Sequence, residues 1–117
     1  MKLSTKQQKF TACLGKLILF ACSRNYGLTQ GDGHRDKRVF GEFGEKKSYS
    51  AANSVHKIRL AHDYNLFVDG KLIKNGDHPA WLELGEYWET LDDDARWGGR
   101  FDTVDSNHFS FEHWGCK

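Results

Sequence analysis

Proline is almost absent from this chain, which has one proline and three cysteines among its 117 residues. The three cysteines are an odd number with no Cys-x-x-Cys spacing, so the sequence predicts neither a disulfide framework nor a cysteine-rich zinc site, and we expect reduced thiols. An excess of one charge is also missing, because 17 Lys and Arg residues stand against 16 Asp and Glu residues. This balance excludes the strongly basic surface that is typical of nucleic-acid-binding proteins.

Long hydrophobic runs are missing as well, since no stretch approaches the roughly 18 apolar residues that a membrane span requires. Residues 19–22 (LFAC) superficially resemble a lipoprotein cleavage site. However, Lys16 interrupts the apolar stretch before them, which is unfavourable for a signal peptide. We therefore expect no signal peptide and no membrane span.

The helices and loops can be placed from the spacing of apolar residues. A chain of this length forms one domain, and its 14% aromatic content argues against disorder. Three-four spacing predicts an amphipathic helix over residues 5–24, capped by Ser4 or Thr5 and ended by Gly27. Residues 30–50 are rich in glycine and charge, which predicts a long loop that is functional or contains a short helix.

The second half of the chain predicts strands and one more helix. Residues 60–68 alternate in polarity, and Asp69-Gly70 after them predicts a tight hairpin. Residues 79–91 predict a helix that begins at Pro79 and has an apolar stripe of large aromatic residues. Residues 109–111 predict a final short strand. The expected class is α+β, with a small antiparallel sheet packed against helices.

The most informative pattern consists of His56, Asp63 and His108. Two imidazoles and one carboxylate make a three-ligand set whose fourth tetrahedral position is open, as in a catalytic zinc site. On one helix, His56 and Asp63 would lie about 10 Å apart along the axis, which is too far for one ion. We therefore expect His56 in a turn that enters the strand and Asp63 on the strand itself.

Strand alternation separates the neighbouring histidines. His62 points to the face opposite Asp63, so we expect it in or near the core rather than at the same ion. His108 and His113 also lie on opposite faces of their strand, and spacing alone leaves open which of them is the third ligand. Asp105, three residues before His108, favours His108 because it supplies a general base for hydrolysis.

These residues and their surroundings resemble the zinc site of the M15 peptidases. The shared pattern is Ser54-x-His56-x6-Asp63 followed by Asp105-x-x-His108. Residues 59–67 (RLAHDYNLF), 85–88 (GEYW), 96–101 (RWGGRF) and 107–111 (NHFSF) are similar to small phage members, so the resemblance spans nearly the whole chain. The family includes D-alanyl-D-alanine carboxypeptidases and dipeptidases, and phage L-alanyl-D-glutamate endolysins.

The resemblance implies a role for each residue of the pattern. His56, Asp63 and His108 would bind one Zn²⁺ per chain, and Asp105 would be the catalytic acid and base. Arg35 matches the family arginine that steadies the scissile carbonyl oxygen, which makes it a second catalytic residue.

Substrate contacts are predicted at two further positions. Ser54 matches the family serine next to the first ligand. Trp97 and Trp114 are candidates to line a substrate cleft beside the zinc, with partly exposed packing as the alternative. His62 departs from the family, which commonly has an apolar residue there. The catalytic carboxylate is an Asp rather than the Glu of the dipeptidase branch, which favours the endolysin-like branch.

Residues 1–117 are thus expected to form a single M15-like peptidase domain with the hedgehog/DD-peptidase-like fold. The predicted function is zinc-dependent hydrolysis of a peptidoglycan stem-peptide bond, as an L-Ala-D-Glu endopeptidase of the phage endolysin kind. The alternatives are a D-Ala-D-Ala carboxypeptidase of the same family and a non-catalytic metal-binding domain of a virion or cell wall.

A small metal nuclease is a further alternative, suggested by Asn107, His108 and His113, but the near-neutral charge disfavours it. We expect a monomer with neither a nucleic-acid nor a membrane partner. It would reside in the host cytoplasm before release and then act at the bacterial cell wall, which it would reach with the help of another protein.

Overall fold

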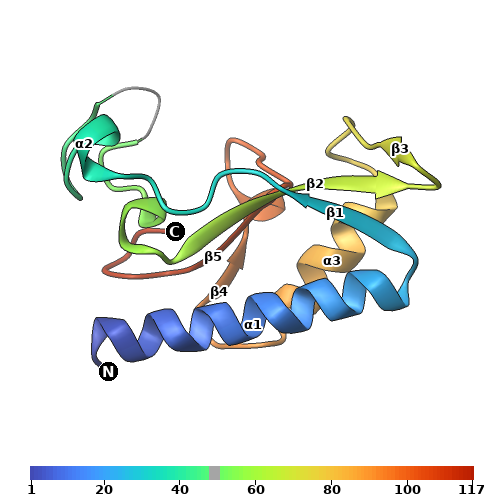
Figure 1. Cartoon of the computed structure of the whole chain (residues 1–117), viewed down its shortest axis with the longest axis horizontal. Helices are drawn as coiled ribbons and strands as arrows, with labels where there is room; N and C mark the ends of the chain where they lie inside the picture. Colours follow the sequence, from blue (N-terminus) through green and yellow to red (C-terminus); the bar gives the residue numbers. More distant parts are fainter. Residues whose placement is uncertain (48–50) are drawn as a thin grey trace.

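The sheet and its helices are seen in the computed structural model, which describes residues 1–47 and 51–117 (Figure 1). The first half of the chain contains α1 (Leu3–Ser23), β1 (Tyr26–Gln30), α2 (Lys37–Phe40) and the 3-10 helix η1 (Val55–Ile58). The second half contains β2 (Ala61–Val68), β3 (Lys71–Leu72), α3 (Pro79–Glu89), β4 (Ala95–Trp97), the 3-10 helix η2 (Gly98–Arg100) and β5 (His108–Phe111).

In the described part of the chain, the strands form one five-stranded antiparallel sheet in the order β1-β2-β5-β4. β3 pairs with the far end of β2 through the tight turn at Asp69 and Gly70, both of which have positive φ. β2 is therefore the central strand, with β1 on one side and β5 on the other. This confirms the predicted hairpin and the α+β class.

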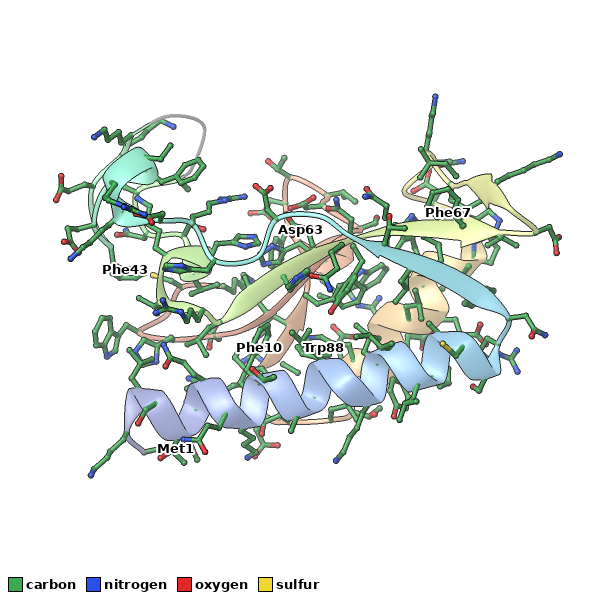
Figure 2. The ribbon with its side chains drawn as sticks, in the orientation of Figure 1. Met1, Phe10, Phe43, Asp63, Phe67 and Trp88 are labelled. Atoms are coloured by element: carbon green, nitrogen blue, oxygen red, sulfur yellow. The ribbon has the colours of Figure 1, made fainter. Side chains whose placement is uncertain are left out.

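The core lies between the sheet and the two long helices. α1 runs beneath the sheet and α3 lies beside it, below the level of β2 (Figure 1). Phe10 of α1 meets Trp88 of α3 and Phe111 of β5 edge to face, with ring centroids 5.6 Å and 5.2 Å apart. Phe10 and Trp88 lie below β2, whereas Asp63 lies on it, away from the helices (Figure 2). The sheet thus keeps one face for packing and leaves the other for polar chemistry.

Both long helices were predicted near their observed positions, but the residues predicted to cap α1 are wrong. Lys2 is the N-cap residue and makes no side-chain capping bond, so neither Ser4 nor Thr5 caps the helix. α1 ends at Ser23, and the chain reverses at Asn25, whose φ is 61°. Because Asn25 adopts the left-handed conformation, Gly27 is not needed for the reversal and instead pairs with Phe67 in the sheet.

The predicted loop over residues 30–50 contains a short helix, α2, which was one of the two possibilities given for it. Asp36 caps this helix by accepting a hydrogen bond from the Arg38 backbone N–H (2.8 Å). Residues 48–50 of that prediction lie outside the described residues. β1 and β4 were not predicted. No helix in the described ranges combines the length and the apolar character that crossing a membrane requires.

Candidate metal centre

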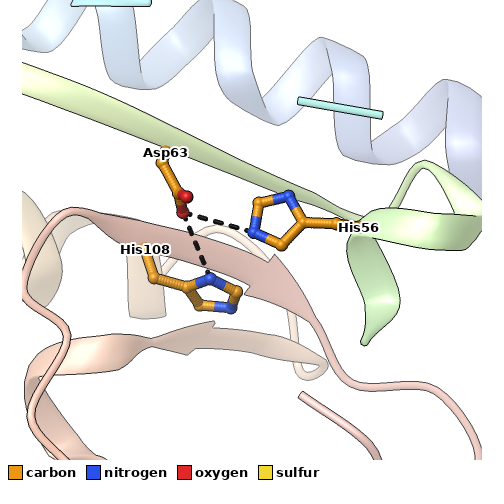
Figure 3. Close-up of side chains that lie close together, drawn as sticks. All are labelled: His56, Asp63 and His108. Atoms are coloured by element: carbon orange, nitrogen blue, oxygen red, sulfur yellow. Dashed lines mark ion pairs between the residues drawn. The ribbon is translucent and has the colours of Figure 1, made fainter. Parts of the chain in front are cut away.

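Three side chains from three elements converge on the polar side of β2 (Figure 3). Asp63 projects from β2, His108 from β5, and His56 from η1, the turn that precedes β2. Asp63 Oδ1 lies 3.3 Å from His56 Nε2 and 3.3 Å from His108 Nδ1. All three side chains are largely shielded from solvent, so their polar atoms face one another and not bulk water.

These distances fit a shared metal ion. Ligand atoms about 2.0–2.1 Å from a zinc ion in tetrahedral geometry lie about 3.3 Å from one another. The ligand atoms of His56, Asp63 and His108 all lie within 4.8 Å of one another. Asp63 Oδ1 is buried and has no well-oriented hydrogen-bond donor among the described residues, although the two imidazole nitrogens are near it. An oxygen placed in this way is satisfied by a cation held between the three side chains.

The neighbouring imidazoles also keep Asp63 charged. Burial by itself raises the pKa of Asp63, but His108 and His56 outweigh this effect and hold the pKa below its ordinary value. Asp63 is therefore a carboxylate at neutral pH, which is the form that binds metal.

The orientation of His56 is set by the glycine-rich segment before α2. His56 Nδ1 lies 2.8 Å from the carbonyl oxygen of Gly33, which can only accept a hydrogen bond. Nδ1 must therefore carry a proton, which leaves Nε2, the nitrogen that faces Asp63, as the one that can bind a metal. His56 is also positioned through its backbone, because its carbonyl accepts a hydrogen bond from the Arg35 backbone N–H (3.2 Å).

Asp105 stands next to this triangle without being part of it. Its Oδ2 lies 4.0 Å from His108 Nδ1, and its side chain is 53% exposed. Burial, helped by the charge of Asp63, raises the pKa of Asp105 above its ordinary value, although His108 opposes the rise. A raised pKa makes this carboxylate a stronger base than an ordinary aspartate, which suits a residue that accepts a proton beside a metal site.

Arg35 and Ser54 are bonded to each other at the same site. Arg35 Nη1 donates to Ser54 Oγ at 3.2 Å, and Ser54 Oγ also accepts from the backbone N–H of His56 at 3.3 Å. Arg35 Nη2 lies 3.4 Å from an oxygen of Asp32 and 4.0 Å from Asp63 Oδ2. Ser54 thus links the guanidinium to the turn that carries the first candidate ligand.

A cavity of about 190 Å³ opens beside the three candidate ligands. Its walls include five predicted site residues, namely Arg35, Ser54, His56, Asp105 and His108. Four further wall residues were not predicted from the sequence: Ala51, Asn53, Phe101 and Lys117. The structure therefore brings together the predicted base, the predicted arginine and two imidazoles around one opening.

Trp97 is the predicted site residue that the structure places elsewhere. It is only 4% exposed and is absent from the cavity walls. Its Nε1 donates to the Ser106 carbonyl (2.7 Å). A Cβ on Gly85 or on Gly99 would lie 2.1 Å or 2.3 Å from the Trp97 ring, so the indole fits closely between these glycines. Trp97 packs in the core and supports the turn that carries Asp105.

Trp114, the other tryptophan considered for the cleft, is 75% exposed. It meets the Phe43 ring edge to face, with the ring centroids 5.7 Å apart. The residues that line the 190 Å³ cavity do not include it.

The turn from Asp105 to His108 depends on a residue that sequence reasoning missed. Gly98 accepts a hydrogen bond from the Asp105 N–H (2.9 Å), and the Asp105 carbonyl accepts one from the His108 N–H (3.0 Å). A Cβ on Gly98 would lie 2.0 Å from the Asp105 carbonyl oxygen and 2.9 Å from the His108 Cβ. The paired glycines 98–99 were visible in the sequence, but only the fold shows what approaches them.

His62 and His113 both lie away from the three candidate ligands, although β5 ends at Phe111 and so does not include His113. His62 stacks on Tyr64, with ring centroids 4.5 Å apart, and does not face the three candidate ligands. His113 is next to Lys6 of α1, with Nδ1 3.4 Å from the ammonium nitrogen. His108, and not His113, is therefore the histidine that the structure brings to His56 and Asp63.

One comparison with known proteins identifies the same region. A family model of M15 peptidases, described as D-alanyl-D-alanine carboxypeptidase, matches residues 48–111, which is more than half of the chain. The matched segment contains the three candidate ligands as well as Ser54 and Asp105. Arg35 lies before it. No curated protein matches the chain.

Proposed function

Since this chain belongs to the M15 peptidase family, we propose that it is a zinc-dependent endopeptidase that hydrolyses the L-Ala-D-Glu bond of the peptidoglycan stem peptide. The observation that carries this proposal is the triangle of His56, Asp63 and His108 beside a cavity that Asp105 and Arg35 also line. Three protein ligands leave one position of a tetrahedral ion for the reaction, whereas a structural zinc site uses four.

His56, Asp63 and His108 would hold the zinc ion, which would supply a Lewis acid and activate a water molecule for hydrolysis at neutral pH. Asp105 takes a proton from the attacking water as the water oxygen bonds to the peptide carbonyl carbon, and it delivers that proton to the amine nitrogen as the C–N bond breaks. Its position 4.0 Å from a ligand nitrogen keeps it close to the reacting atoms without making it a ligand.

Arg35 stabilises the charge that develops on the carbonyl oxygen. Its guanidinium is bound on one side by Ser54 and Asp32 and lines the cavity, so it is oriented before the substrate arrives. A preorganised donor of this kind is worth about 3 kcal/mol of transition-state stabilisation.

A D-Ala-D-Ala carboxypeptidase is the second candidate. The matching family model is described by that activity, and the Lys117 side chain in the cavity wall offers a cation for a terminal carboxylate. The short catalytic carboxylate of Asp105 supports the endopeptidase instead, because the sequence resembles the endolysin-like branch in this respect. Either reaction would take place at the bacterial cell wall.

Digestion of purified peptidoglycan by the zinc-loaded protein tests the proposal, with mass analysis of the released ends and a chelator control. New L-Ala and D-Glu ends that disappear with chelator are the expected result. Loss of terminal D-Ala would establish the carboxypeptidase. One equivalent of bound zinc with neither bond cleaved would indicate a non-catalytic metal-binding domain.

A further inference from the structure

A second cavity, of about 300 Å³, lies on the other side of Asp105. Asp105 is a wall of both cavities, so the candidate base stands between them. The second cavity is formed by the segment after β3, the beginning of α3 and the turn at residues 104–107. In Figure 1 the loop between η2 and β5 rises above the sheet, between the η1 end of β2 and the β3 hairpin. A peptide bound across Asp105 would therefore extend from the metal centre into this cavity.

Two buried aromatic residues in its walls have polar atoms without protein partners. Tyr64 is 3% exposed and Trp81 is 4% exposed. Within residues 1–47 and 51–117, neither the Tyr64 hydroxyl nor the Trp81 indole nitrogen is hydrogen-bonded to another residue. Neither of these two polar atoms is enclosed in the protein interior, so both remain accessible to solvent and can donate to a ligand bound in the cavity.

A third donor is the ammonium group of Lys74, an exposed residue in the same cavity. No acidic residue in the described part of the chain forms an ion pair with it. A phenol is protonated at neutral pH, so the Tyr64 hydroxyl is a hydrogen-bond donor there. Together, Lys74, Tyr64 and Trp81 offer a carboxylate one positive charge and two neutral donors, against one acidic wall residue, Asp105.

The other walls combine the polar residues Asn65, Asp105 and Asn107 with apolar side chains. Ile73 is partly buried against the core, and Val104 is 60% exposed. Ser106 closes the base of the loop by donating from its hydroxyl to the Gly76 carbonyl at 2.8 Å, which holds the two sides of the cavity together. The cavity therefore combines donors for an anion with room for a short aliphatic side chain.

We propose that this cavity is a second substrate subsite, which binds the free carboxylate of an acidic residue of the stem peptide through Lys74, Tyr64 and Trp81. The subsite rests on the proposed function, because it is the neighbouring part of the same cleft. It makes the enzyme selective for stem peptides whose glutamate or diaminopimelate carboxyl group is free rather than amidated.

Direct binding separates the subsite from the reaction. Full-length, zinc-loaded Asp105→Asn protein is titrated with two synthetic stem peptides, one with a free carboxyl group and one with the corresponding amide. Tryptophan fluorescence reports binding. The free acid is expected to bind about fivefold more tightly, the size of effect that one partly exposed charge pair gives.

Two variants in the Asp105→Asn background test the named residues. Tyr64→Phe removes only the hydroxyl, so it should lower affinity for the free acid while leaving Tm unchanged, because that hydroxyl has no protein partner to lose. Lys74→Ala should abolish the preference for the acid over the amide. Lys71→Ala is the matched control, since Lys71 is an exposed lysine of the neighbouring strand that does not line the cavity, and it should leave the preference intact.

The possible outcomes distinguish failure of the subsite from failure of the proposed function. Equal binding of acid and amide by the Asp105→Asn protein, or a Lys71→Ala effect as large as that of Lys74→Ala, would overturn the subsite. Cleavage of stem peptides by the wild type, with no dependence on Lys74 or Tyr64, would overturn the subsite but keep the proposed function. Selective binding without any cleavage by the wild type would keep the subsite and reject the peptidase.

Discussion

Asp63 and His108 lie directly opposite each other across β2 and β5. These two residues do not form a backbone hydrogen bond with each other. The Asp63 N–H donates to the Asp32 carbonyl, and the His108 N–H donates to the Asp105 carbonyl. The next pair along, Tyr64 and Asn107, makes the cross-strand bond at 3.0 Å. Side chains approach most closely in the non-hydrogen-bonded pairs of an antiparallel ladder. The strand register therefore sets the distance between two of the three candidate ligands.

Substitution of the candidate base should affect turnover alone, whereas substitution of a candidate ligand should affect zinc binding as well. Asp105→Asn is expected to retain one zinc per chain but to lose about 10²–10⁴-fold in kcat, because an amide cannot take the proton. His108→Ala should lose both zinc and turnover, since one of three ligands is gone. Metal analysis and a stem-peptide assay measure the two effects. A His108→Ala protein with normal zinc content would contradict the ligand assignment.

Removal of the metal should destabilise the fold. A ligand that binds only the native state at 100 times its Kd contributes about 2.7 kcal/mol, which corresponds to roughly 10 °C in the Tm of a domain of this size. Thermal unfolding with zinc and with chelator measures this difference. The His108→Ala protein is the control, and a zinc-dependent rise in its Tm as large as that of the wild type would place the stabilising ion elsewhere.

Arg35 is expected to act on the reaction rather than on metal binding. Arg35→Ala should keep its zinc and lose about 10²–10³-fold in kcat, the cost of removing one donor to a developing oxyanion. Arg35→Lys keeps the charge but not the planar fork that reaches Ser54 and Asp32, so it should recover only part of the loss. Steady-state kinetics with zinc saturation measure both variants; full activity in Arg35→Ala would exclude this role.

Gly98 is expected to be indispensable for the position of Asp105. A methyl group there would lie 2.0 Å from the Asp105 carbonyl oxygen, so Gly98→Ala must displace the turn that carries both Asp105 and His108. Lower Tm and weaker zinc binding should result.

Gly15→Ala is the matched control for Gly98→Ala, since nothing lies within 4 Å of a Cβ at that position of α1. It should raise stability by about 1 kcal/mol through helix propensity. Chemical denaturation of both variants measures the contrast. Equal stabilisation of the two would show that the turn adapts to the methyl group.

The cysteines should differ in reactivity. Burial raises the pKa of the Cys13 thiol, and Cys13 packs in the core, whereas Cys22 is exposed on the same helix. A raised pKa means a smaller thiolate fraction at a given pH, and the thiolate is the form that is alkylated. Iodoacetamide at pH 8 should therefore modify Cys22 well before Cys13, as peptide mass spectrometry measures. Modification of both at one rate would indicate that the N-terminal helix detaches readily.

The three candidate ligands could be predicted because strand periodicity is a local property. Alternation along β2 separates Asp63 from His62, whereas the choice of His108 over His113 depended on Asp105 nearby, because His113 lies beyond the end of β5. The buried position of Trp97 could not be predicted from periodicity. The sequence places an aromatic residue near the glycines but does not show which element covers it, and here Gly85 of α3 lies against its ring.

The two strands that were not predicted, β1 and β4, both lack a clear sequence pattern. β1 contains a glycine and is largely exposed, and β4 has only three residues, so neither shows a clear alternation. The second cavity was beyond sequence reasoning for a different reason. Tyr64 looks like an ordinary core residue of β2, and its unpartnered hydroxyl is evident only once its neighbours are known.

The metal centre is assembled from residues far apart in the chain, since Asp63 and His108 pair directly although they are 45 positions apart. Closing so long a loop is entropically costly, so contacts of this kind form late in folding. Zinc can bind at full strength only after β2 and β5 have paired, which makes metal uptake a marker of completed folding. A nascent or partly unfolded chain would therefore remain inactive until its C-terminal strand has joined the sheet.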